Sequence, residues 1–256
     1  MNRNLLKIAL KSLLHNKKDA IYQFLITLLL AAIVTGSLFT GFSVRKSLRS
    51  SVYSRLGNTD IEISTGTRYF SPSLADTLAK ISGEKSTAIL EADGYCQNFS
   101  TNASALDINI YGVEANFFLF HGVDSLAVPK GEVFINSRLS NIIGINEGEE
   151  IMIRFKDTDP LPDNAPFAPS EEETTIRKIM RVAKILDDGE MGDFYLGVSQ
   201  MEQANIFMNR NDMGESANRM LLTDDLKRGT QYFSGILAEN MGITDIGLSV
   251  RVSEKR

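Results

Sequence analysis

The chain has 256 residues, a net charge of −5, 43% hydrophobic residues and 23% charged residues. These values exclude a disordered chain, and the acidic balance excludes a polybasic nucleic-acid-binding surface, so no nucleic-acid partner is expected. Cys96 is the only cysteine, which excludes an intramolecular disulfide and requires the fold to be held by its core. Such a cysteine is most often a small buried hydrophobe, with an intermolecular or reactive role as the alternative.

Residues 1–18 place leucines on one face of a helical pattern and basic residues on the other face. This arrangement predicts an amphipathic helix that lies along the cytoplasmic leaflet of a membrane, with its basic side chains at the anionic lipid headgroups. His15 is expected to lie at headgroup level rather than to bind a ligand. An early start of the following membrane helix is the alternative interpretation.

Residues 19–44 are predicted to form a transmembrane helix, because residues 20–44 contain no Asp, Glu, Lys or Arg. A helix needs about 20 apolar residues to cross the hydrocarbon core of a bilayer. A buried helix of a soluble domain is one alternative, but residues 24–34 are apolar on all sides except at Thr27. A cleaved signal peptide is the other, but this run is longer and Arg45 and Lys46 follow it directly.

Basic residues flank the span on both sides, with five before it and three directly after it. The positive-inside rule therefore favours a cytoplasmic N-terminus and a main domain outside the cytoplasm. Small residues recur four positions apart inside the span, at Gly36 and Thr40 and at Ser37 and Gly41. This spacing lets another helix approach closely, so it indicates partner helices in the membrane.

Residues 45–57 continue the helical spacing through Leu48, Val52 and Leu56, which predicts a stalk helix that Gly57 and Asn58 end. Residues 58–256 then mix strand and helix patterns, typical of an α+β fold. The predicted strands are residues 61–64, 86–99, 105–113, 133–135, 150–155, 175–186, 193–198 and 219–223. The predicted helices are residues 73–81, capped by Ser73 and ended by Gly83, 137–143, capped by Asn136 or Ser137 and ended by Gly144, 199–207 and 224–241.

Two segments of this domain are predicted to be irregular. Residues 116–121 form a short aromatic-rich connection, and residues 157–174 form a loop that contains four prolines. Three consecutive glutamates at positions 171–173 lie in that loop. They lack the spacing and the glycine of a calcium loop, so they are interpreted as a solvated edge.

Catalytic motifs are missing from the sequence. Residues 83–86 lack the glycines of a phosphate loop, and no G-x-S-x-G motif occurs. Two isolated histidines and one cysteine do not match a zinc site, so His121 is interpreted as structural. We therefore expect no enzyme activity and predict no catalytic, cofactor-binding or metal-binding residues, with catalysis by dispersed residues as the alternative.

Several segments resemble ABC transporter permeases of the FtsX/MacB type. SVRKSLRSSVYSRLGNTDIEISTGTRYF (residues 43–70) resembles the stalk and first strand of the large multi-span permeases of that group. GEVFINSRLSNIIGINEGEEIMIRF (residues 131–155) resembles the strand, helix, glycine turn and strand of the MacB-like periplasmic core domain. PLPDNAP (residues 160–166) and IRKIMRVAKILDDGEMGDF (residues 176–194) resemble the segments that follow.

This resemblance implies a single N-terminal transmembrane helix with a helical stalk, followed by a mixed α/β extracytoplasmic domain over residues 58–256. It implies a bacterial inner membrane location, a separate cytoplasmic ATPase as partner, and contacts with lipid and with other permease helices or a second permease copy. The family's further membrane helices do not follow here, so the chain is expected to be an N-terminal part of a longer permease, with a core domain that can be incomplete at its C-terminus. No cofactor is implied for this chain.

The predicted function is coupling of ATP hydrolysis by the partner to movement of the extracytoplasmic domain, for export or release of a substrate. In this hypothesis residues 45–56 act as the lever, and residues 60–241 are the moving or cargo-facing part. The alternative is a single-span anchored ligand-binding or sensor domain, and an anchored enzyme is a third possibility. The leader of about 18 residues is short for a folded cytoplasmic output module.

Overall fold

The computed structural model describes residues 17–64, 69–124, 126–156, 175–197, 199, 201–214, 216–223, 232, 236–237 and 249–252. The chain divides into two compact units, Met1–Val52 and Tyr53–Arg256. The amphipathic helix predicted over residues 1–18 lies outside the described residues except at its last two positions. The proline loop lies wholly outside them, and so does most of the helix predicted over residues 224–241.

Helix α2 (Lys17–Leu56) is a single helix of 40 residues, which corresponds to a length of about 60 Å. None of its residues is buried, so it is not the core helix of a soluble domain. The hydroxyls of Thr27, Thr35 and Thr40 donate to backbone carbonyls four residues earlier, which satisfies these polar groups within the helix. Within the described part of the chain, α2 is the one helix long and apolar enough to cross a membrane.

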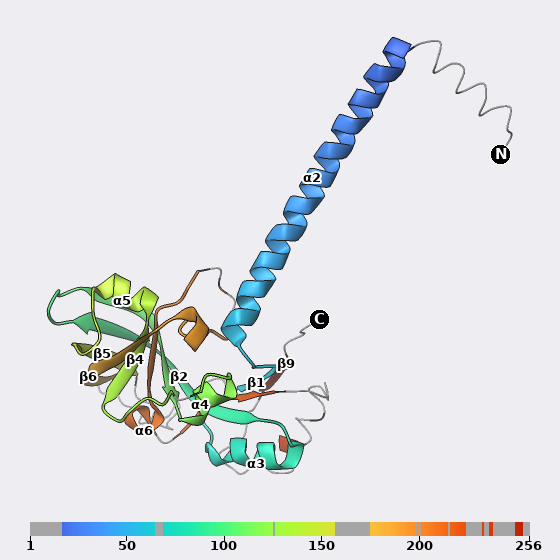
Figure 1. The fold of residues 1–256 in the computed structure, drawn as a ribbon. Coiled ribbons are helices and arrows are strands. Elements are labelled where there is room, and N and C mark those ends of the chain that lie inside the picture. The colour runs from blue at the N-terminus through green and yellow to red at the C-terminus, as the bar shows by residue number, and fades with distance from the viewer. Residues whose placement is uncertain are drawn as a thin grey trace, which may run out of the picture. The chain divides into compact units, whose positions relative to one another are not determined.

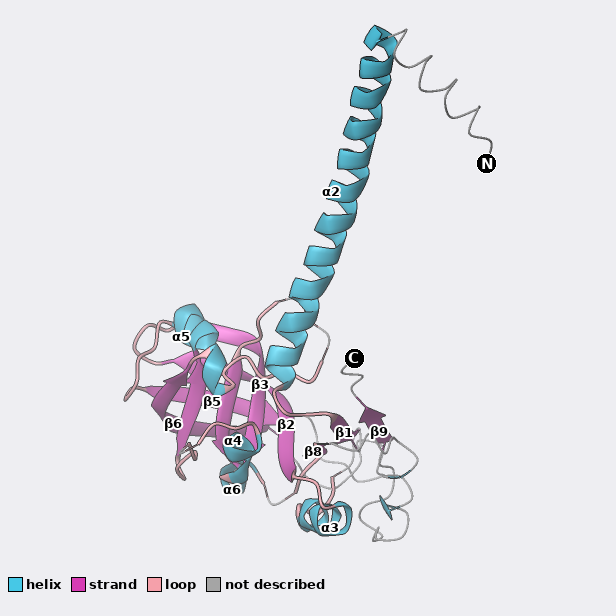
Figure 2. Cartoon of the chain, turned by 45° about the vertical axis from the view of Figure 1, so that its right-hand side comes forward, coloured by secondary structure: helices cyan, strands magenta, loops and turns pink. Residues whose placement is uncertain are grey.

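Six strands of the second unit close into a barrel (Figure 2). They pair in the ring order β2 (Ser86–Asn98), β3 (Ser104–Val113), β7 (Asn205–Asn209), β4 (Glu132–Asn136), β6 (Thr175–Leu186) and β5 (Glu150–Lys156), and β5 pairs with β2 again. The β3–β7 and β4–β6 pairs are parallel and the other four are antiparallel. A ring of this kind leaves no open sheet edge within the barrel.

Apolar side chains that alternate along the strands fill the barrel. Ile110, Ile135, Ile153 and Ile206 come from four different strands and are fully buried in one cluster. Helix α5 (Ser137–Ile143) lies at one end of the barrel and helix α6 (Arg210–Met213) at the other (Figure 1). Cys96 also lies in this cluster, and burial raises the pKa of its thiol to about 12.

A smaller sheet extends from the first residues of β2. Ser86–Ile89 pair with β8 (Arg219–Leu222), β8 pairs with β1 (Ile61–Ser64), and β1 pairs with β9 (Ser249–Val252). Ile61 and Ile63 of β1 pack against helix α3 (Ser73–Ser82) in a second apolar cluster. Strand β2 therefore belongs to both the barrel and the smaller sheet.

Most of the predicted elements are confirmed. The stalk is helical, the strands predicted near residues 61, 86, 105, 133, 150, 175 and 219 are present, and Asn136 caps α5 by accepting a hydrogen bond from Leu139 N. Gly83 and Gly144 end their helices in the left-handed conformation. Strand β9 was not predicted.

The predicted connection at residues 116–121 is wrong, because Asn116–Phe120 form helix α4. Phe117, Phe118 and Phe120 are buried, and Leu119 is exposed. The buried rings stabilise this short helix on the outer surface of the barrel by packing against Phe134 and Phe207.

Two predictions near residue 200 are also wrong. Of the helix predicted over residues 199–207, residues 205–207 belong to strand β7 (Asn205–Asn209) and the described residues before them are irregular. Ile206 and Met208 enter the barrel while Phe207 packs outside. The strand predicted over residues 193–198 is irregular where it is described, after a 3-10 turn, η1 (Asp188–Glu190). Its alternation arises because Phe194 and Leu196 cover the outer surface of the barrel.

The predicted serine cap of α3 is wrong as well. Pro72 is the residue before the helix, its backbone is already helical, and no side chain caps the helix N-terminus. Ser73 is the first residue of the helix, and its hydroxyl is hydrogen bonded to that of Ser71. The fixed backbone angle of proline favours a helical start without a side-chain cap.

Candidate functional site

The last turn of α2, residues 53–56, belongs to the same compact unit as the barrel. The helix ends at Gly57, which has a φ of 54° and donates its N–H to Tyr53 O and Ser54 O, both at 3.2 Å. A Cβ atom here would overlap Nδ1 of His121 and lie 2.8 Å from the terminal methyl of Met191. Both the positive φ and the close packing therefore require glycine at the helix end.

Arg55 fixes this turn to a distant segment of the chain. Its Nη1 donates to the backbone oxygens of Ser199 at 2.9 Å and of Met201 at 3.2 Å. Its Nε lies 3.8 Å from Oδ2 of Asp193, and the two side chains are only 11% and 12% exposed. A shielded pair of this kind interacts more strongly than an ion pair in open solvent.

Asp193 is held in an unfavourable environment for its charge. Burial raises the pKa of this carboxyl above its usual value, and repulsion from Asp188 adds to the rise, while the guanidinium of Arg55 opposes it. Loss of Arg55 would therefore leave a buried carboxylate without its compensating cation. The contact depends on both partners.

Asn58 makes a second attachment directly after the helix. Its backbone N–H donates to Nδ1 of His121 at 3.2 Å, and its Nδ2 donates to Phe120 O at 3.0 Å. The His121 ring packs against Phe117, Phe120 and Phe194. His121 therefore has a structural role, as the sequence predicts, and the position that it supports is the end of the helix.

The chain enters the domain core within four residues of the helix end. Thr59 N donates to Leu56 O, and Asp60 N donates to Leu222 O of β8, both at 3.0 Å. Ile61 follows and is fully buried. We call residues 55–60 the helix joint. Hydrogen bonds at Gly57, Asn58, Thr59 and Asp60 leave no run of unbonded backbone to act as a flexible linker.

The sequence predicted the helical stalk but not the groups that hold its end. Arg55 and Gly57 lie within the predicted stalk, whereas Asp193, Ser199 and Met201 come from a segment that was predicted to be strand and helix. Their distance from Arg55 in the sequence gave no local signal. A basic residue two positions before a helix-ending glycine was the one available indication.

No family model and no curated protein matches the chain. Its fold combines a long apolar helix with an α+β domain that contains a barrel. Among solved structures the chain is similar to the periplasmic region of MacB from Actinobacillus actinomycetemcomitans, with 14% sequence identity and a TM-score of 0.48. The match covers 78% of this chain and 91% of that chain.

Proposed function

We propose that this chain carries the first membrane helix and the extracytoplasmic domain of an ABC transporter permease of the FtsX/MacB type. In this proposal α2 crosses the inner membrane with its N-terminus in the cytoplasm. A separate cytoplasmic ATPase supplies the energy, and other permease helices or a second permease copy pack against α2. ATP-driven movement of α2 then reaches the extracytoplasmic domain through the helix joint, for export or release of a substrate.

The observation that carries this proposal is the continuity of the chain from the apolar segment to the domain core. One helix runs without a break from Lys17 to Leu56, its last turn is tied to the domain by Arg55, and the next residues are hydrogen bonded. A passive anchor functions equally well with a flexible linker. A helix with a fixed end can transmit rotation or displacement, so the continuity favours transmission over simple anchoring.

The sequence resemblance supports the same proposal. The segment that resembles the MacB-like core forms strand β4, helix α5, a glycine turn and strand β5, in the order that the resemblance implies. The small residues of α2 supply positions where partner helices can approach. None of the large apolar side chains of α2 is buried within the chain, which leaves them available to lipid and to partner helices.

An experiment that interrupts α2 outside the membrane tests whether the helix transmits movement. A Pro-Gly pair inserted at Leu48 of the full-length permease breaks the helix, whereas an Ala-Ala pair at the same place has the same length and keeps it helical. With the ATPase present, we expect ATP to change hydrogen exchange of the extracytoplasmic domain in the wild type and not in the Pro-Gly variant. An unchanged ATP response in a well-folded Pro-Gly variant would contradict transmission.

An anchored ligand-binding or sensor domain is the second candidate. The observation that favours it is a polar cavity in the domain, lined by charged side chains from three strands. Absence of any ATP-dependent response in the wild-type protein, together with specific ligand binding, would favour this second function.

A further inference from the structure

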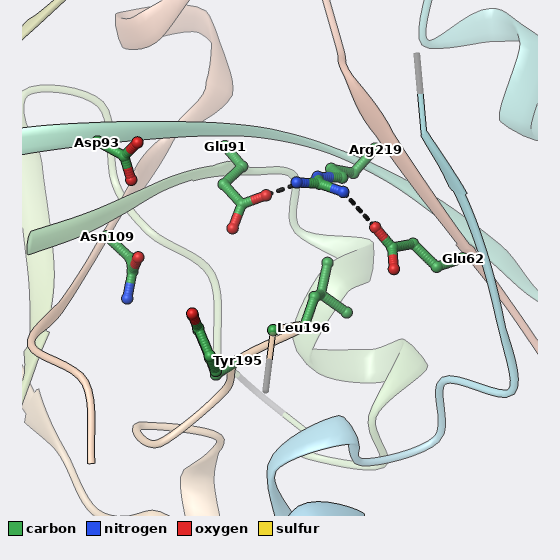
Figure 3. Close-up of a pocket in the computed structure, with 8 residues that line it drawn as sticks. Glu62, Glu91, Asp93, Asn109, Tyr195, Leu196 and Arg219 are labelled. Atoms are coloured by element: carbon green, nitrogen blue, oxygen red, sulfur yellow. Dashed lines mark hydrogen bonds and ion pairs between the residues drawn. The ribbon is translucent and has the colours of Figure 1, made fainter. Parts of the chain in front are cut away.

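A polar cavity of about 270 Å³ lies where the smaller sheet and the barrel separate along β2. The first four residues of β2 pair with β8, and residues 94–98 pair with β5, so the two partner strands diverge between these stretches. The residues that line the cavity come from β1, β2, β3, β8 and the irregular segment after η1 (Figure 3). They are Glu62, Glu91, Asp93, Asn109, Tyr195, Leu196, Gly197 and Arg219.

Two of the three guanidinium nitrogens of Arg219 are bonded to side chains beside the cavity. Its Nε donates to Glu91 at 2.6 Å, and its Nη1 forms an ion pair with Glu62 and a 3.2 Å hydrogen bond with Ser64 Oγ. Three carboxylates and one guanidinium line the cavity, which is a formal balance of −2. The lining therefore attracts cations and repels anions.

Several hydrogen-bond acceptors of the lining residues, by contrast, face the cavity. In Figure 3 one carboxylate oxygen of Glu91 is bonded to Arg219, while the other points into the open space together with the Tyr195 hydroxyl. Asn109 donates its Nδ2 to Asn205 Oδ1 at 3.1 Å, so its own carbonyl oxygen is left as an acceptor. Asn205 in turn donates to the carbonyls of Gly192 and Phe194, which fixes this amide orientation.

A buried phenol beneath this lining supplies an independent indication of a ligand. Tyr111 is fully buried, and its hydroxyl has no hydrogen-bond partner within the described part of the chain. Its ring is fixed between Phe194 and Phe207. Tyr111 lies directly opposite Glu91 in the antiparallel register of β2 and β3, so its side chain leaves the sheet on the same face as that of Glu91.

A buried polar atom without a partner costs about 1–3 kcal/mol. A ligand that bonds to Tyr111 would remove this cost. Burial also raises the pKa of Glu91, which the adjacent Arg219 only partly offsets, so a bound cation would stabilise the ionised form of this carboxyl. The burial of Glu91 favours a ligand with positive charge, and the Tyr111 hydroxyl favours one that can hydrogen bond.

A metal ion does not fit this arrangement. Over the described ranges no group of three or more His, Cys, Asp or Glu side chains is placed to hold a metal ion. Arg219 already occupies one oxygen each of Glu62 and Glu91, and its charge opposes a divalent ion in the same space. An organic ammonium ion has a lower charge and presents N–H donors to separate acceptors.

We propose that this cavity is a binding site for a small organic cation that carries primary amino groups. The ammonium group binds between Glu91, Asp93 and the Asn109 carbonyl, above the hydroxyl of Tyr111. Asp93, which is exposed at the cavity mouth, attracts the ligand, and Tyr195 covers it. This site is argued from the domain alone, so it does not depend on the permease proposal.

The test uses putrescine as the probe and the full chain in detergent micelles, with binding measured by isothermal titration calorimetry at low salt. We expect a dissociation constant of about 1 mM or tighter. Butanediol of the same chain length lacks the charge, and succinate carries the opposite charge, so neither should bind. Binding of putrescine no stronger than that of butanediol overturns the proposal, as does tighter binding of succinate or of calcium.

Two variants locate the site. Asp93→Asn removes the exposed carboxylate and should weaken putrescine binding about tenfold, whereas the matched exposed variant Asp124→Asn should leave it unchanged. Tyr111→Phe keeps the ring between its aromatic neighbours and should weaken binding about threefold without lowering the thermal unfolding midpoint. Wild-type affinity in both the Asp93 and the Tyr111 variants overturns the assignment of the site.

Discussion

The barrel and the smaller sheet share strand β2 but are built in different ways. In the barrel every strand is paired on both sides, and buried isoleucines from four strands meet in the centre. In the smaller sheet β1 has only four residues, one face carries Ile61 and Ile63, and the other carries Glu62 with its ion pair to Arg219. The closed part supplies stability, and the smaller sheet receives the helix and supplies part of the polar cavity.

This contrast predicts the largest stability loss inside the barrel. Ile153→Ala, at a fully buried position of β5, should lower the free energy of unfolding by about 2–5 kcal/mol. Ile179→Ala on the neighbouring strand β6 is the matched control, because Ile179 is 63% exposed. This variant should change the free energy of unfolding by less than about 0.5 kcal/mol. Urea denaturation of the two variants measures the difference. Equal losses would show that the barrel interior is not the main core.

The next effect should come from the helix joint. Arg55→Ala removes the cation beside Asp193 and the donor to two backbone carbonyls, so we expect a loss of about 2 kcal/mol. Arg45→Ala replaces an exposed residue of the same helix and should change the free energy of unfolding little. Thermal or urea unfolding of the globular unit is the readout. Identical unfolding of the two variants would mean that Arg55 does not hold the helix end.

Two glycines that end helices distinguish the effect of close packing at the helix joint from the ordinary preference for glycine at a helix end. Gly57 and Gly83 both end helices at positive φ, but a Cβ at Gly83 meets nothing within 4 Å, whereas one at Gly57 overlaps His121. Gly83→Ala should cost about 1 kcal/mol for the left-handed backbone alone. Gly57→Ala should cost about 1–2 kcal/mol more because of the added contact. Equal costs would indicate that the joint is loosely packed.

The smallest expected effect is on the reactivity of the Cys96 thiol in the barrel. Its pKa is raised to about 12 by burial, so the thiol stays protonated at pH 8 and its contribution to stability is lost only as the pH rises from about 9 toward 12. We expect a thiol reagent to modify Cys96 at pH 8 no faster than the protein unfolds. Rapid labelling of the native protein would show that the barrel opens locally at β2.

Local patterns predicted the elements better than their arrangement. Alternation of Ile151, Ile153 and Phe155 identified β5, and Gly144 identified the end of α5. The same reasoning failed for β7, because Ile206, Phe207 and Met208 are buried on both faces and lose the alternating pattern. The closure of the barrel depends on pairings such as β3 with β7, whose residues are about 100 positions apart.

The polar cavity was beyond sequence reasoning for the same reason. Glu62, Glu91 and Arg219 come from three strands, and each is an ordinary charged residue in its own segment. Only the register that places Ser64 opposite Arg219 and Glu91 opposite Tyr111 brings them together. The apolar helix, by contrast, is a local property of residues 20–44, and its helical conformation was predicted from them.

If α2 transmits movement, the helix joint must be fixed to the domain core. Native-state hydrogen exchange of the backbone amides at positions 57–60 tests it most directly, because each of these four amides donates a hydrogen bond. We expect protection of these amides that approaches that of the barrel strands, and faster exchange in the Arg55→Ala variant. Exchange of these amides at the rate of an open loop in the wild-type protein would contradict it.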